Sequence, residues 1–68
     1  MTHPEILTIF KQLFPLFAGG VDEWFPNGKN SIRVRISEVD IDYVFTYNDI
    51  LDWKFETINC FLKNLNKN

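Results

Sequence analysis

The sequence contains few of the side chains that most catalytic and metal sites require. There is one histidine, His3, and one cysteine, Cys60. A lone cysteine forms neither an internal disulfide nor a thiolate zinc site, and it is typical of a reducing compartment. His3 lies beside the amino end, where a general base is rarely held in place. Because no phosphate-binding glycine loop or metal-ligand spacing occurs either, we expect no catalytic residues, no metal and no cofactor.

Long apolar runs and a surplus of basic residues are also missing. The longest apolar stretches are too short for a membrane-spanning helix. The first residues contain no basic segment followed by an apolar run, so we expect no secretory signal. Seven Lys and Arg stand against nine Asp and Glu, for a net charge of −2. This balance argues against a general nucleic-acid-binding protein, because such proteins hold phosphates largely with Lys and Arg. We expect a cytoplasmic protein that binds no membrane.

Aromatic residues, by contrast, are abundant. Seven Phe, two Trp and two Tyr make up 16% of the 68 residues. This length allows a single domain, residues 1–68, and a domain of this size buries only about 60% of the surface of its unfolded chain. A few large rings can supply the apolar area that a short chain otherwise lacks.

Residues 2–14 carry the pattern of an amphipathic helix. Thr2 and Glu5 are spaced as a capping box, and Pro4 lies in the first turn, where its missing N–H costs nothing. Pro15 predicts that this helix ends or kinks one residue earlier. The apolar residues recur at helical spacing, as Ile6, Ile9, Phe10, Leu13, Phe14 and Phe17.

The middle of the chain predicts an antiparallel hairpin. Residues 31–36 and 39–47 both alternate between apolar and polar side chains. A two-residue turn would place Arg35 opposite Asp40, whereas a four-residue loop would place it opposite Asp42. In either register apolar side chains face apolar ones, and basic side chains face acidic ones. The charged face is therefore predicted to be a water-facing ion-pair surface rather than an active site.

A second helix is predicted over residues 49–65. Asn48 or Asp49 can cap it, and Asp52 follows in the first turn, where acidic side chains complement the helix dipole. Trp53 would lie on the side opposite the apolar residues. Those apolar residues recur at spacings of four and three, as Leu51, Phe55, Ile58, Leu62 and Leu65.

Together these elements predict an α+β fold. Residues 21–25 are compatible with a strand or a packed loop, so the expected antiparallel meander has two or three strands. One face of this sheet is apolar and includes Tyr43 and Phe45, whereas the other face is charged. Placing both helices on the apolar face is the most economical packing, because each helix then buries its apolar side against the sheet.

The order of helix, strands and helix resembles that of the double-stranded-RNA-binding domain. In that family the second helix opens with a lysine-rich cluster that contacts phosphates. Residues 48–56 instead hold three acids and Lys54 as the single basic residue. We therefore expect no direct nucleic-acid binding.

Three aromatic residues are candidates for a protein-binding surface. Trp53 would face away from the apolar side of its helix, and Trp24 and Phe25 precede a turn on the weakest predicted element. Exposed tryptophan is enriched at binding hot spots. Each tryptophan would instead belong to the core if the first helix, kinked at Pro15, folds over it.

A second candidate surface is acidic and includes Asp49, Asp52 and Glu56. Residues 38–56 hold six acidic and one basic side chain, for a net charge of −5. Such a region can attract a basic partner or imitate the charge of a nucleic acid. It can equally be the solvated face of the second helix.

Three segments resemble small uncharacterised prophage proteins of low-GC Gram-positive bacteria, namely Trp24-Phe25-Pro26-Asn27-Gly28, Ser31-Ile32-Arg33-Val34-Arg35-Ile36 and Phe45-Thr46-Tyr47-Asn48. The resemblance covers residues 21–57. It implies an accessory role in the cytoplasm of a bacterial host cell, with no defined activity and no catalytic residues to carry over.

We therefore expect a small non-enzymatic protein–protein interaction module of a phage or mobile element, which binds a host or phage protein. The alternative is an acidic, nucleic-acid-mimicking inhibitor of a host defence nuclease or of a DNA-binding regulator. A homodimer is a further expectation, because exposed sheet edges pair readily with a second copy and small domains gain stability in this way.

Overall fold

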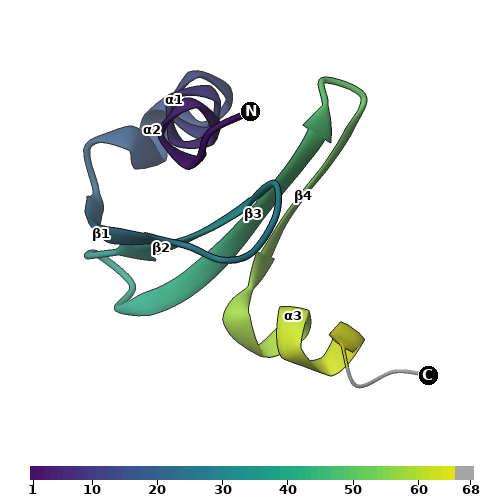
Figure 1. Cartoon of the computed structure of the whole chain (residues 1–68). Coiled ribbons are helices and arrows are strands. Elements are labelled where there is room, and N and C mark those ends of the chain that lie inside the picture. Colours follow the sequence, from purple (N-terminus) through teal and green to yellow (C-terminus); the bar gives the residue numbers. More distant parts are fainter. Residues whose placement is uncertain (66–68) are drawn as a thin grey trace.

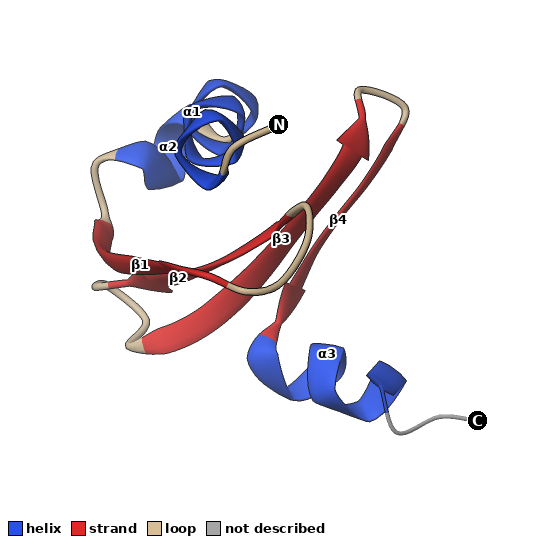
Figure 2. Cartoon of the chain, in the orientation of Figure 1, coloured by secondary structure: helices blue, strands red, loops and turns tan. Residues whose placement is uncertain are grey.

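A four-stranded antiparallel sheet lies at the centre of the molecule (Figures 1 and 2). The computed structural model describes residues 1–65. Its strands follow one another in chain order, so that β1 and β4 are the two edges. The strands are β1 (Val21–Pro26), β2 (Ser31–Ile36), β3 (Ile41–Asp49) and β4 (Asp52–Thr57). The predicted α+β class is confirmed, with a fourth strand in addition to the two or three expected.

The first helix, α1 (His3–Leu13), begins at the predicted capping box. The backbone N–H of Thr2 donates to Glu5 Oε1 at 2.8 Å, and the backbone N–H of Glu5 donates to Thr2 Oγ1. The helix stops before Pro15, and the short helix α2 (Pro15–Ala18) follows. The break predicted from the proline is thus confirmed.

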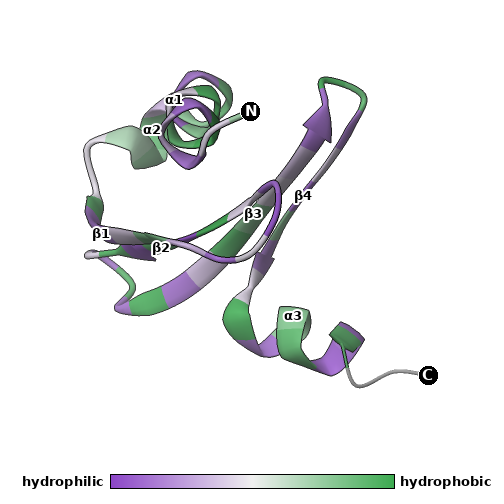
Figure 3. Cartoon of the chain, viewed as in Figure 1, coloured by the Kyte–Doolittle hydropathy of each residue, from purple (hydrophilic) through white to green (hydrophobic). Residues whose placement is uncertain are grey.

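Helix α1 covers one face of the sheet, which we call the near face and which carries Phe45 and Phe55. The ring of Phe10 on α1 lies 5.4 Å from the ring of Phe45. Phe45 is fully buried, as predicted, whereas Tyr43 is only half-buried. Along β3 hydrophobic segments lie between hydrophilic ones, and its two adjacent buried hydrophobic residues, Val44 and Phe45, point to opposite faces of the sheet (Figure 3). The buried core consists of Ile6, Phe10, Ile32, Val34, Ile36 and Phe45.

The helix predicted over residues 49–65 is wrong in its first half. Residues 52–57 form β4, and only α3 (Ile58–Leu65) is helical. Trp53 and Phe55 pair with Tyr47 and Phe45 of β3. Aromatic and β-branched side chains favour such a half-buried, pleated position, and cross-strand ring contacts outweigh the helical spacing of the apolar residues.

The prediction that both helices lie on one face is also wrong. Helix α1 lies on the near face, and α3 lies on the opposite, far face, which carries Val44 and Glu56 (Figure 1). The side-chain amide of Asn64 on α3 donates to Glu56 Oε1 at 3.0 Å. The far face is not simply water-facing, since Val44 is fully buried there. None of the helices within residues 1–65 is long and apolar enough to cross a membrane.

Candidate functional site

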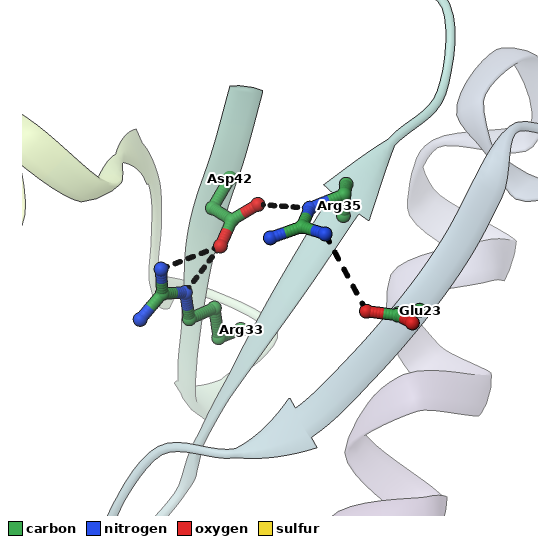
Figure 4. A network of polar contacts seen from close by, with 4 residues as sticks. All are labelled: Glu23, Arg33, Arg35 and Asp42. Atoms are coloured by element: carbon green, nitrogen blue, oxygen red, sulfur yellow. Dashed lines mark hydrogen bonds and ion pairs between the residues drawn. The ribbon is translucent and has the colours of Figure 1, made fainter. Parts of the chain in front are cut away.

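A chain of ion pairs crosses the far face from β1 to β3 (Figure 4). Asp42 accepts hydrogen bonds from Arg33 Nε at 2.6 Å and from Arg35 Nε at 2.8 Å, one on each carboxylate oxygen. Arg35 Nη1 lies 3.5 Å from a carboxylate oxygen of Glu23 on β1. Arg35 and Asp42 are cross-strand partners, which confirms the four-residue loop between β2 and β3.

Asp42 is nearly buried, and this corrects the view of the charged face as fully water-facing. Its side chain is 8% exposed, whereas those of Arg33 and Arg35 are 41% exposed. The hydrogen bond from Arg35 lowers the pKa of Asp42, and Arg33 adds to this effect against the opposing influence of burial. The bond to Asp42 likewise raises the pKa of Arg35. Both carboxylate oxygens of Asp42 are occupied, so the network has a structural role.

Eight aromatic rings form one connected cluster on the near face. Phe14 is its centre, with its ring 4.7 Å from that of Phe55 and 5.4 Å from that of Trp53. The cluster is buried beneath α1 but reaches the surface beside β4, where Phe17 and Trp53 are each 38% exposed. We call Phe17, Trp53 and Phe55 the aromatic edge surface. The full cluster consists of Phe10, Phe14, Phe17, Tyr43, Phe45, Tyr47, Trp53 and Phe55.

The three aromatic residues singled out from the sequence do not come together. Trp53 is on β4 and Trp24 is on β1, at opposite edges of the near face. Trp24 is half-buried and packs against the core. Phe25 is paired with Arg33 and therefore lies on the far face, where it is 47% exposed. Trp53 remains exposed, although it lies on a strand rather than on the polar side of a helix.

The three acidic candidates are likewise divided. Asp49 and Asp52 face each other across the β3–β4 turn, and Glu56 lies farther along the far face. None of them is in the first turn of a helix, so the helix-dipole explanation for these acids is wrong. The turn between Asp49 and Asp52 exposes two apolar side chains, with Ile50 at 55% and Leu51 at 92%.

A cleft between α3 and the far face was missed by the sequence analysis. Its volume is about 330 Å³, and its lining mixes charged, amide and apolar residues. Lys54 lies there beside Asp52 and Glu56, so the charges of the cleft partly offset each other. The cleft exists only because α3 occupies the far face, which no local sequence pattern indicates.

The edge of β4 is the second feature that the sequence analysis missed. Residues 53–57 pair with residues 43–47 of β3 in an unbroken register. Its opposite side has no neighbouring strand in the described part of the chain. Such an edge leaves backbone N–H and C=O groups free to pair with a further strand. The signal was present as an alternation of Trp53, Phe55 and Thr57 with charged residues, but it competed with the helical spacing.

The single histidine and the single cysteine lie on opposite sides of the sheet. His3 Nε2 bonds to the carbonyl oxygen of Gly28 at 2.7 Å and so links α1 to the β1–β2 turn. Cys60 is exposed on α3, on the other side of the sheet. Within residues 1–65, no three His, Cys, Asp or Glu side chains gather as a metal ion would require.

No protein-family model matches the chain, and no curated protein or solved structure matches it either.

Proposed function

We propose that this chain is a small non-enzymatic protein-binding module, an accessory protein of a phage or mobile element that binds a host or phage protein. The supporting observation is the aromatic edge surface. Trp53 and Phe17 remain 38% exposed although their rings continue directly into the core cluster. Rings that are held from beneath lose little freedom on binding, and tryptophan is the residue type most enriched in hot spots.

The partner proposed for this surface is a protein segment that carries apolar and basic side chains together. Beside Trp53, the β3–β4 turn exposes Ile50 and Leu51 and is flanked by Asp49 and Asp52. An apolar side chain of the partner would pack on the ring and the turn. A lysine or arginine of the partner would pair with the two acids, which have no basic neighbour in a salt bridge among residues 1–65.

The acidic nucleic-acid mimic has less support. Such a mimic needs a continuous row of free carboxylates to replace phosphates. Here Asp42 is neutralised by Arg33 and Arg35, and Glu56 is bonded to Asn64. The other four acids of residues 38–56 lie at opposite ends of β3, with Glu38 and Asp40 in the β2–β3 turn and Asp49 and Asp52 at the β3–β4 turn, so they form no continuous row.

Binding by Trp53 is tested with a matched pair of variants. Trp53→Ala removes the exposed ring of β4, whereas Phe25→Ala removes a comparably exposed ring at the other edge of the sheet. A protein captured from host lysate should be purified and its affinity measured by calorimetry. Trp53→Ala should weaken that affinity by about 2 kcal/mol, about thirtyfold, and Phe25→Ala should leave it unchanged.

Two outcomes contradict this proposal. Equal affinity of the wild type and Trp53→Ala would remove the aromatic edge surface from the interface. Displacement of the partner by DNA or RNA, with a steep loss of affinity in high salt, would support the acidic mimic instead, because exposed charges are screened beyond about 8 Å at physiological ionic strength.

A further inference from the structure

The free edge of β4 carries a charge pattern that complements itself. On the far face Lys54 and Glu56 stand two residues apart, and on the near face Phe55 lies between them in the sequence. Oε1 of Glu56 accepts from Asn64 of α3, which leaves the second carboxylate oxygen, Oε2, for a pairing across this edge. In Figure 1 no helix or strand of residues 1–65 lies beyond β4 at this edge of the sheet. A second strand can therefore approach residues 53–57 along their whole length.

A second copy of β4 would meet this edge with two-fold symmetry. In an antiparallel pair with a perpendicular two-fold axis, one residue faces its own copy and its neighbours face each other crosswise. With the axis at Phe55, Lys54 of each copy faces Glu56 of the other, and Trp53 faces Thr57. Opposed residues share one face of the sheet, so two opposite-charge pairs form on the far face and the rings meet on the near face.

The other symmetric registers are poorer. An axis at Lys54 sets this lysine against itself and Asp52 against Glu56. An axis at Glu56 sets two carboxylates against each other. An axis at Trp53 does place Asp52 opposite Lys54, but it pairs three residues of β4, 52–54, where the axis at Phe55 pairs five, 53–57.

We propose that the chain forms a homodimer in which β4 pairs with β4 of a second copy, antiparallel and centred on Phe55. The two sheets of four strands then become one continuous sheet. The aromatic edge surfaces of both copies become neighbours on one face, which joins Trp53 of each copy to a wider apolar area. The dimer does not depend on the protein partner proposed above, and its test is separate from that of the partner.

Charge reversal across the axis tests the register. Sedimentation equilibrium of the wild type should give twice the monomer mass of 8.1 kDa. Lys54→Glu sets two like charges opposite each other at both pairs, and so does Glu56→Lys. Each single variant should weaken dimerisation at least about tenfold. An equimolar mixture of the two variants should form a heterodimer, because each introduced charge then faces an opposite one.

Lys29→Glu is the matched control for Lys54→Glu, since Lys29 is exposed in the β1–β2 turn and its reversal changes the net charge in the same direction and by the same amount. It should leave the dimer intact, and circular dichroism should show native secondary structure in every variant. A wild type that stays monomeric from about 10 µM to 1 mM overturns the proposal. So does a variant mixture that stays monomeric. Loss of the dimer in Lys54→Glu alone, with Glu56→Lys unaffected, overturns the register at Phe55 and indicates the one at Trp53.

Discussion

The two edge strands of the sheet, β1 and β4, have the same length but opposite characters. β1 has an irregular register between Val21 and Glu23 and ends at Pro26, which has no N–H to donate. It also carries two adjacent acids, Asp22 and Glu23, which repel a second copy of the same strand. Features of this kind protect an edge from pairing. In β4 the register shifts only beside the β3–β4 turn, and residues 53–57 pair regularly with β3. Charged residues alternate with rings there, and the ring of Trp53 is exposed, so this edge is open to a partner.

The edges also differ in how they are held to the sheet. β1 is tied to β2 by the ion pair from Glu23 to Arg35, which continues to Asp42. β4 has no such ion pair within residues 1–65, and its near-face side chains are held by ring contacts: Phe55 and Trp53 both lie against Phe14, and Trp53 also lies against Phe45. A strand held by its near-face rings can keep those rings in place while its outer edge binds something else.

The largest loss of stability is expected when a buried ring of the aromatic cluster is removed. Phe45→Ala should lower the free energy of unfolding by about 3–5 kcal/mol, because it leaves a cavity in a fully buried site beneath α1. That is enough to unfold so small a domain. Urea denaturation followed by circular dichroism measures the loss. Near wild-type stability would mean that β4 is not anchored by this cluster.

An intermediate loss of stability is expected when the ion pairs that link β2 to β3 are weakened. Asp42→Asn should cost about 2 kcal/mol, because it weakens two charged hydrogen bonds at a nearly buried site. Asp40→Asn is the control, since Asp40 is exposed in the β2–β3 turn with φ of 52°, a conformation that asparagine accepts. The two variants are compared by urea denaturation, and equal losses would place Asp42 in solvent.

The lowered pKa of Asp42 predicts that the stability of the fold depends on pH. The pKa of Asp42 is lowered in the folded state from its ordinary value of 3.8. The carboxylate therefore contributes stability above that pH, and the contribution is lost as the pH falls through the lowered folded pKa. Wild-type stability should fall below about pH 4 more steeply than that of Asp42→Asn. Parallel acid limbs for the two proteins would contradict the role of the network.

The smallest change in stability is expected for the ion pair between Glu23 and Arg35. Glu23→Gln should change the free energy of unfolding by about 0.5 kcal/mol or less, because both side chains are exposed and their contact is 3.5 Å long. Urea denaturation at low and high salt provides the measurement. A larger cost would mean that the β1 edge depends on this ion pair and is less firmly built than its bulge and proline suggest.

Where local rules decide, the sequence predicted the structure. The capping box of Thr2 and Glu5 starts α1, and Pro15 ends it because a proline restricts the residue before it. The alternation in residues 31–36 and 41–47 set which side chains share a face, because the side-chain period of a strand is two. The sequence also singled out Trp53 as exposed, although on the wrong element.

Residues 49–65 show what the sequence alone could not decide. Phe55 fits both the helical spacing that begins at Leu51 and the alternation with Trp53 and Thr57. Pairing with β3 favours the strand for residues 52–57, because Phe45 and Tyr47 of this nine-residue strand lie opposite Phe55 and Trp53. With residues 52–57 in β4, α3 lies on the far face, and the open edge of β4 and the cleft both result from this arrangement. By itself the sequence determined the first helix and the faces of the hairpin, because those depend on neighbours in the chain; the tertiary structure alone decided the edge, because a strand exists only beside its partner.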